Sequence, residues 1–116
     1  MGKSLTFVLI AIFVAVFAFT PFNQSSAQSD WATFWQKFKT AVAKNDKKTI
    51  LSLSDSAQLP ADYQALFGTA AKRKCFRTTK PEKDDEGGYN VFCGEQGYYF
   101  KKVNGQFRFT EGFAND

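Results

Sequence analysis

Apolar side chains recur at intervals of three and four residues between positions 29 and 46, which is the spacing of one face of an α-helix. Ser29 or Asp30 can accept hydrogen bonds from the free N–H groups of the first turn, and Asn45-Asp46 supplies a stop signal. The pattern therefore predicts a long amphipathic helix. Its buried face consists of Trp31, Phe34, Trp35, Phe38, Ala41 and Val42.

Two shorter helices are predicted directly after the first. Asp46 is placed to cap a helix over residues 47–54, and Pro60 suits the first position of a third helix. The residues expected to point inward are Ile50, Leu51 and Leu53 in the second helix, and Tyr63, Leu66 and Phe67 in the third. Helices therefore fill the first half of the chain.

From Ala71 the pattern changes to short β segments rich in aromatic residues and separated by polar turns. The turn at Asn104-Gly105 is of the kind that a two-residue type I′ hairpin requires. It sets a register in which Phe100 lies opposite Phe109. The segments predict a four-stranded antiparallel sheet over residues 72–79, 89–93, 97–103 and 106–113.

The same register places Lys102 opposite Phe107, and a turn at residues 94–96 is expected to pair Val91 with Phe100. Side chains alternate between the two faces of a sheet, so each face can be assigned. The face expected to pack beneath the first helix collects Cys75, Val91, Cys93, Tyr98, Phe100, Phe107 and Phe109.

The opposite face of the sheet is expected to carry an aromatic patch with cations beside it: Phe76, Phe92, Tyr99, Lys101 and Arg108. Such a patch can serve as an interaction surface for a partner or ligand. The simpler interpretation is that the second or third helix, or the chain end at residues 111–116, covers it. Both interpretations remain open at this point.

The chain has two cysteines, Cys75 and Cys93, on either side of a charged loop. If that loop is a hairpin centred on Asp84, the two residues lie directly opposite each other on neighbouring strands, within the reach of a disulfide. A structural disulfide is therefore predicted. A redox-active pair is less favoured because the cysteines are far apart in sequence. A metal site is less favoured still, since the chain has no histidine.

The first 27 residues have the anatomy of a signal peptide. Lys3 gives a positive start, residues 5–19 are apolar and uncharged, and small residues precede a predicted cleavage point between Ala27 and Gln28. An uncleaved anchor is the alternative, although the apolar run is short of the ~20 residues that span a bilayer. Residues 28–116 then form a single small α+β domain, secreted or periplasmic, which touches the membrane only through the segment before cleavage.

Composition points away from several kinds of chemistry. Export and the modest excess of basic residues, 15 against 11 acidic in the whole chain, do not favour a nucleic-acid partner. The acidic stretch at residues 81–88 lacks the ligand spacing of a calcium loop and is interpreted as a solvated hairpin loop. We predict no catalytic residue, metal or cofactor, because these carboxylates have simpler roles as helix caps, turn residues or strand ends: Asp30, Asp46, Asp55, Asp62 and Glu111.

The order of motifs, "FW..F..AV...D...I..L" followed by "YYF.KV.G.F.F" over residues 31–113, resembles small exported bacterial proteins of uncharacterised function. More distantly it is similar to the α+β roll of the nuclear transport factor two-like and cystatin-like folds. The resemblance implies helices packed on a cone-shaped roll. Enzymes of that superfamily use carboxylate or histidine dyads, and cystatin-type inhibitors use a Q-x-V-x-G loop; neither feature is matched in this chain.

These observations favour a non-enzymatic binding or interaction protein of the cell envelope. Its partner would be an unidentified protein or small-molecule ligand, and inhibition of an exported hydrolase is one concrete form of such a role. The alternative is a small-molecule carrier or a carboxylate-dependent enzyme that uses a pocket between the first helix and the sheet.

Overall fold

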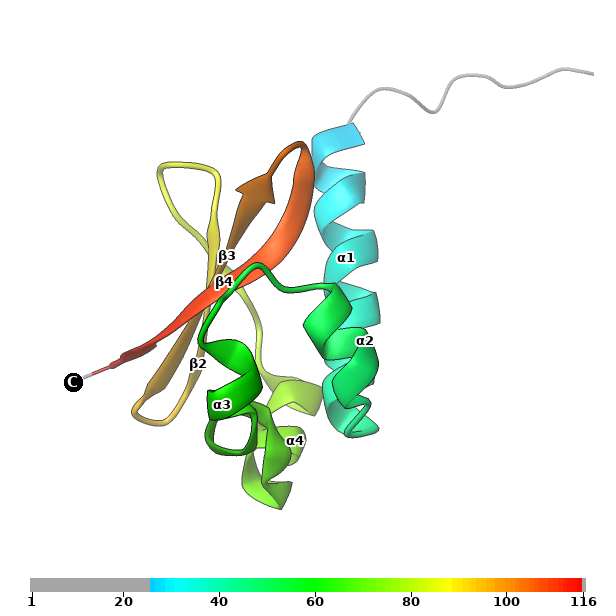
Figure 1. The fold of residues 1–116 in the computed structure, drawn as a ribbon. Coiled ribbons are helices and arrows are strands. Elements are labelled where there is room, and N and C mark those ends of the chain that lie inside the picture. Colours follow the sequence, from blue (N-terminus) through cyan, green and yellow to red (C-terminus); the bar gives the residue numbers. More distant parts are fainter. Residues whose placement is uncertain (1–25, 116) are drawn as a thin grey trace, which may run out of the picture.

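Helices come first along the chain and strands last, as the sequence predicts. The computed structural model describes residues 26–115, with side chains described from Asp30 onward. The helical elements are α1 (Ser26–Ala43), α2 (Lys47–Ser52), α3 (Leu59–Tyr63), the π-helical turn η3 (Gln64–Gly68) and α4 (Ala70–Thr78). The strands are β1 (Glu82–Lys83), β2 (Tyr89–Cys93), β3 (Gln96–Val103) and β4 (Gln106–Ala114). The described helices cover one face of the four-stranded antiparallel sheet (Figure 1), which confirms the α+β fold class.

Residues 1–25 of the predicted signal segment lie outside the described residues. The predicted cleavage point between Ala27 and Gln28 lies in the first turn of α1. Because this helix begins at Ser26, the expectation that Ser29 or Asp30 caps its start is wrong. The cleavage itself stays a prediction.

Helix α1 ends where the sequence predicts. Asn45 adopts a left-handed backbone conformation with φ 54°, which asparagine tolerates better than most residues. The N–H of Asn45 donates to the carbonyl of Val42, and the N–H of Asp46 donates to that of Ala41. These bonds satisfy carbonyl groups at the end of the helix. Asp46 then caps α2 by accepting a hydrogen bond from the N–H of Thr49, so the chain passes from one helix to the next without a long loop.

The segment at residues 72–79 is helical, and its prediction as a strand is wrong. Thr69 caps α4 by accepting a hydrogen bond from the N–H of Lys72, and the following Ala-Ala-Lys-Arg-Lys run consists of good helix formers. The fourth strand of the sheet comes instead from the predicted loop, where Glu82 and Lys83 form the short strand β1 against β2.

The hairpin of β3 and β4 has the predicted register. Phe100 pairs with Phe109 and Lys102 with Phe107, and both turn residues have positive φ, 54° at Asn104 and 83° at Gly105. A β-bulge next to Phe100 shifts the remaining pairs by one residue. The turn between β2 and β3 is tighter than predicted, so Val91 pairs with Tyr98 and not with Phe100. This shift of two residues leaves the side chains of β2 and β3 on their predicted faces.

The core lies between α1 and the sheet and is built mainly from aromatic rings. Phe38 is fully buried, and its ring centroid lies 5.1 Å from that of Phe100 and 5.5 Å from that of Phe67. Near the start of α1, Trp31 stacks on Tyr89 with ring centroids 3.8 Å apart. Every residue of the predicted buried face of α1 is buried. The helix stripe and the sheet face therefore meet as the spacing predicts.

Candidate binding site

The space between α1 and the sheet is filled by side chains. The rings of Phe34, Trp35 and Phe38 all lie within 6 Å of the ring of Phe100, centroid to centroid. No polar or charged side chain is buried in residues 30–115. The carboxylates considered in the sequence, Asp30, Asp46, Asp55, Asp62 and Glu111, are all exposed. Among them Asp46 has a lowered pKa, chiefly because the Thr49 hydroxyl donates a hydrogen bond to it.

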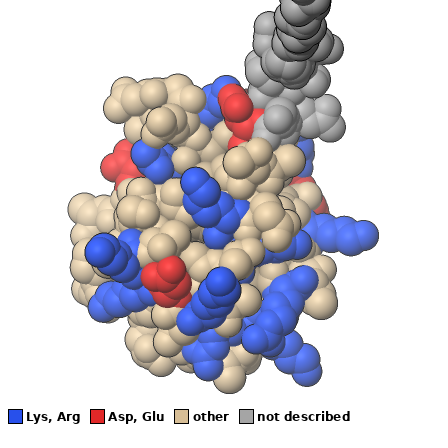
Figure 2. Space-filling view, turned by 90° about the vertical axis from the view of Figure 1, so that its right-hand side faces the viewer, with Lys and Arg blue, Asp and Glu red and all other residues tan. Residues whose placement is uncertain are grey.

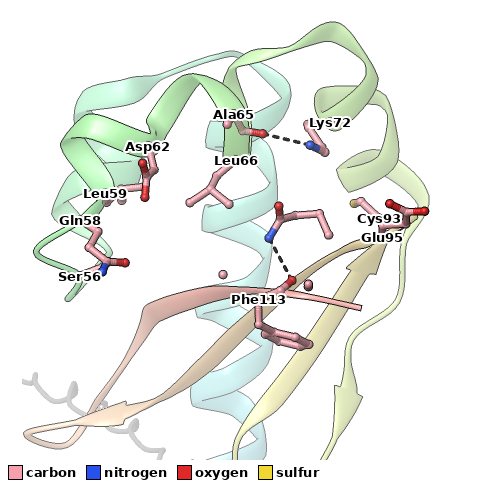
Figure 3. Close-up of a pocket in the computed structure, with 13 residues that line it drawn as sticks. Ser56, Gln58, Leu59, Asp62, Ala65, Leu66, Lys72, Cys93, Glu95 and Phe113 are labelled. Atoms are coloured by element: carbon pink, nitrogen blue, oxygen red, sulfur yellow. Dashed lines mark hydrogen bonds between the residues drawn. The ribbon is translucent and has the colours of Figure 1, made fainter. Parts of the chain in front are cut away.

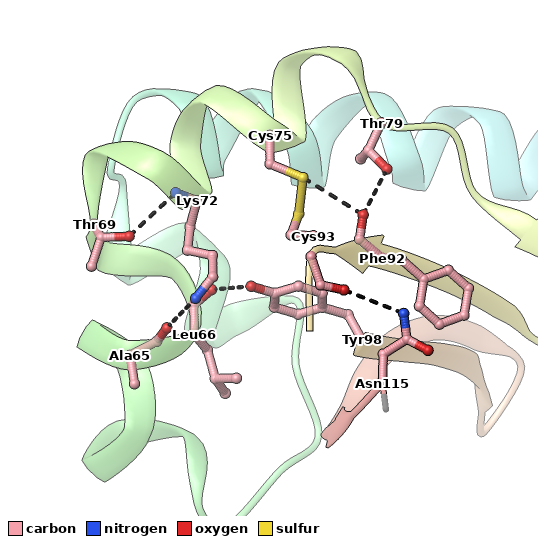
Figure 4. The surroundings of a disulfide bond; sticks show 11 residues. Ala65, Leu66, Thr69, Lys72, Cys75, Thr79, Phe92, Cys93, Tyr98 and Asn115 are labelled. Atoms are coloured by element: carbon pink, nitrogen blue, oxygen red, sulfur yellow. Dashed lines mark hydrogen bonds between the residues drawn. A yellow bond between two sulfur atoms is a disulfide. The ribbon is translucent and has the colours of Figure 1, made fainter. Parts of the chain in front are cut away.

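The predicted disulfide between Cys75 and Cys93 is confirmed, but its structural setting differs from the prediction. Cys75 lies on α4 and Cys93 on β2, with Cα atoms 5.9 Å apart (Figure 4). The bond therefore joins a helix to the sheet and does not join two strands. Thr79 supports the same junction, since its hydroxyl donates a hydrogen bond to the carbonyl of Phe92.

The predicted patch on the outer face of the sheet needs one correction. Phe76 is fully buried, because it lies on α4 and points into the core against Phe67 and Tyr98. Phe92 is half-buried beside Phe113, with ring centroids 6.0 Å apart. The described helices do not cover this face (Figure 1), so cover by the second or third helix is wrong, whereas the chain end contributes Phe113.

The three other members of the predicted patch lie on the outer face. Lys101 is exposed and pairs across the hairpin with Arg108. The Arg108 guanidinium donates hydrogen bonds to the Gln106 side chain and to the carbonyl of Ser52. The Tyr99 hydroxyl donates to the carboxylate of Asp84, 2.7 Å away. Two of these three side chains therefore hold neighbouring elements in place, which is a structural role.

The acidic loop is organised around Asp84. Its carboxylate accepts hydrogen bonds from the N–H groups of Glu86 and Gly88 as well as from Tyr99. The Tyr99 bond is the main cause that lowers the pKa of Asp84, and the same bond raises the pKa of Tyr99 to about 12. In residues 30–115 no three acidic or cysteine side chains gather as a metal site would need.

A groove that sequence reasoning missed lies between the α3–η3 segment and the end of the sheet (Figure 3). Its volume is about 590 Å³, within the usual range for ligand sites. Leu66 lies on one wall and the end of β4 on the other. Lys72 crosses one end, where its ammonium group donates to the carbonyl of Ala65. Polar side chains around the opening include Gln58, Asp62, Glu95 and Gln96.

Charge is unevenly divided between the two layers. Residues 30–80 carry ten lysines and arginines against four aspartates, whereas residues 81–115 carry four against six acidic residues. Figure 2 shows that lysines and arginines gather on the side of the molecule away from the sheet. We call the exposed surface of α1, the turn after it, α2 and α4 the basic face. The exposed or half-exposed basic residues of these segments include Lys37, Lys39, Lys44, Lys48, Lys74 and Arg77.

Few acidic side chains neutralise the positive charges of the basic face. In the described part of the chain, the one ion pair within 4.0 Å joins Lys102 to Asp30 at 3.9 Å, and neither residue belongs to the face. Lys37 and Lys44 line a shallow hollow between α1 and α2, and Asp46 there is occupied in capping α2. The positive charges are therefore available to an anion outside the molecule.

Comparison with protein-family models, with curated proteins and with solved structures finds no match. In residues 26–115 no helix has the length and apolar character needed to cross a membrane. A disulfide is compatible with an oxidising compartment outside the cytoplasm.

Proposed function

We propose that the protein is an exported, non-enzymatic binding protein of the cell envelope. In place of the expectation that it touches the membrane only before cleavage, we propose that the folded domain docks through its basic face on an anionic lipid surface. The filled core is the observation that supports a non-enzymatic binding role. Enzymes that rely on carboxylates bury one and raise its pKa, and residues 30–115 bury none. The space where a carrier would hold its ligand is likewise occupied by the rings of α1 and the sheet.

The uneven distribution of charge supports docking on an anionic lipid surface. The basic face spans three helices of one layer, so its side chains can approach a flat surface together (Figure 2). Most of its charges are lysines, whose flexible stems suit a diffuse negative surface better than a fixed bidentate ligand. Each basic side chain near an anionic leaflet stabilises binding by about 1 kcal/mol. Six such residues are enough for reversible attachment without an inserted segment.

Export also rests on the apolar segment before α1. Amino-terminal sequencing of protein recovered from an exporting host should begin at Gln28. A product that keeps residues 5–19 would contradict cleavage and favour an anchor. The narrower expectation that the partner is an exported hydrolase, inhibited by this protein, stays a prediction.

Co-sedimentation with lipid vesicles tests the docking. The protein is expected to bind vesicles that contain phosphatidylglycerol and not vesicles of phosphatidylcholine alone. Binding should disappear as salt rises from about 0.1 M to about 1 M, because the screening length falls from about 10 Å to about 3 Å. Lys37→Gln combined with Lys44→Gln should weaken binding about 30-fold, the effect of losing about 2 kcal/mol.

The matched control removes two charges from the other layer, with Lys83→Gln combined with Lys101→Gln. Both lysines are exposed, and neither belongs to the basic face or the groove. Equal weakening by the two double variants would contradict docking through the basic face. Stronger binding to a soluble polyanion, such as polyphosphate, than to the vesicles would contradict a lipid surface as the partner.

A further inference from the structure

The wall of the groove formed by β4 is an open edge of the sheet. The strand order β1-β2-β3-β4 leaves β4 with one strand neighbour. The segment Leu53–Asp55 occupies the first part of its free edge: the N–H of Phe109 donates to the carbonyl of Leu53, and the N–H of Asp55 donates to the carbonyl of Phe109. The chain then turns away into α3. The edge after Phe109 therefore has no strand beside it among residues 26–115.

The register identifies which main-chain groups face the groove. The N–H of Asn115 donates to the carbonyl of Glu95, so Asn115 points its main-chain groups toward β3. Antiparallel pairing alternates along a strand, and the residues one and three positions earlier, Ala114 and Gly112, therefore point theirs away from β3. No hydrogen bond to these groups occurs within residues 26–115.

Leu66 packs on the helix-side face of β4 and borders the open edge. A Cβ atom on Gly112 would lie 2.8 Å from the Cδ2 of Leu66, so the missing side chain lets Leu66 approach the strand. Leu66 gives the groove an apolar part, and Asp62 and Glu95 carry negative charge at its opening (Figure 3). The Phe113 ring lies on the other, outer side of the same strand, beside Phe92. The amine of Lys72 is occupied by the carbonyl of Ala65.

We propose that the groove binds an extended peptide segment of a partner protein, which adds a strand to the open edge of β4. An extended main chain offers donors and acceptors at the spacing of Gly112 and Ala114, and open edges are recurrent sites of such strand addition. Side chains on one face of the segment would meet the Phe113 ring on the outer side, and the alternate ones would face the two carboxylates on the groove side. A peptide with alternating apolar and basic residues fits both. This inference rests on the proposed binding function and names one class of partner.

The test uses the purified, disulfide-intact protein and a synthetic peptide of alternating valine and lysine. Titration followed by NMR should shift the amides of Gly112 and Ala114, and the peptide should slow their exchange with solvent. The same peptide with alternate main-chain nitrogens methylated keeps its side chains and charge. It should bind about ten-fold more weakly, because main-chain hydrogen bonds are lost.

A substitution in the open edge of β4 provides the second test of peptide binding. Ala114→Pro removes an N–H that points away from β3, which an edge strand tolerates. It should weaken peptide binding about ten-fold with the melting curve unchanged. Ala114→Gly keeps the N–H and should bind like the native protein. If the proline variant does not fold, amide exchange in the native protein still decides the outcome.

Unchanged amides at Gly112 and Ala114, or equal binding of the methylated peptide, would overturn the inference. Equal binding by a folded proline variant would do the same. Vesicle binding distinguishes failure of peptide binding in the groove from failure of lipid docking through the basic face. The proline variant leaves the basic face intact and should still bind phosphatidylglycerol vesicles, so failure of the groove and failure of the docking surface give different patterns.

Discussion

Single hydroxyl groups join parts of the fold that are far apart in the sequence. The Tyr98 hydroxyl donates to the carbonyl of Leu66, and the Tyr63 hydroxyl donates to the side chain of Asn45. Burial raises the pKa of both phenols, so both remain neutral donors at physiological pH. The Tyr99 hydroxyl plays the same role for Asp84 on the outer face. The aromatic residues of this chain therefore contribute specific tethers as well as apolar area.

The hydrogen bond between Tyr99 and Asp84 predicts that the stability of the folded state depends on pH at both the acidic and the alkaline end of the scale. Asp84 has a lowered pKa in the folded state, so its contribution is present above about pH 4 and is lost as pH falls through the lowered value. Tyr99 has a pKa raised to about 12, so its contribution is present below about pH 10 and is lost as pH rises through 12.

Phenolate absorbance measures the alkaline part of this prediction. The native protein should show a component that titrates near pH 12 and that Tyr99→Phe removes. In Asp84→Asn the pKa of Tyr99 should fall toward 10, since the charge that holds the proton is gone. Identical alkaline titrations of the native protein and Asp84→Asn would show that the hydrogen bond has no effect on Tyr99.

Phe38 is the residue whose truncation should cost the most. It is fully buried and contacts rings from α1, η3, α4 and the sheet. Loss of such a ring costs about 3–5 kcal/mol, a large share of the stability of a small domain. Phe38→Ala should therefore be unfolded or barely folded in a thermal melt. Arg108→Ala loses the hydrogen bonds to Gln106 and to the carbonyl of Ser52 on the outer face and should cost far less, about 1 kcal/mol. A fully stable Phe38→Ala would mean that the core is looser than its geometry indicates.

At the scale of elements, the sequence predicts those whose signal is local. The stripe of α1 and the Asn104-Gly105 turn each depend on a few neighbouring residues, and both have their predicted geometry. Helix α4 was missed because its apolar positions, Cys75 and Phe76, are adjacent and give no period. The signal that could have found it is Thr69 followed by five good helix formers.

Because the disulfide joins α4 to β2, we expect its loss to lower the stability of the domain substantially. The bond closes a loop with a sequence separation of 18 residues, which contributes about 3 kcal/mol in the chain-entropy account. For a domain of this size the loss lowers the melting temperature by more than about 10 °C. Calorimetry of the reduced protein, or of Cys93→Ser, measures the change. Free thiols that titrate in the untreated native protein would contradict the assignment.

At the scale of the whole molecule, charge is divided between a positive helical layer and a slightly negative sheet layer. The division follows from the order of elements, because nearly all the basic residues outside the strands lie on helices of one layer. The groove could not be predicted in the same way. It depends on the path of residues 53–59 around the edge of β4 and on the contact of Leu66 with Gly112, which no periodicity reveals.

Ion-exchange chromatography tests the uneven distribution of charge directly. Lys37→Glu with Lys44→Glu, and Lys83→Glu with Lys101→Glu, give two variants with the same net charge. A cation exchanger binds through the most positive surface, so the first variant should elute at lower salt than the second. Elution at the same salt would show that retention follows net charge alone and that the basic face has no special field.

The disulfide between α4 and β2 gives the chain a second covalent route around the acidic loop. Asp85, Glu86 and Gly87 are exposed, so a glutamyl endopeptidase should cut here before it reaches the core. The two pieces would remain joined through Cys75 and Cys93. The nicked protein should therefore migrate as one species on a non-reducing gel and as two on a reducing gel. A cut that would divide most small domains leaves this one whole, which makes the loop a suitable place to insert a reporter sequence.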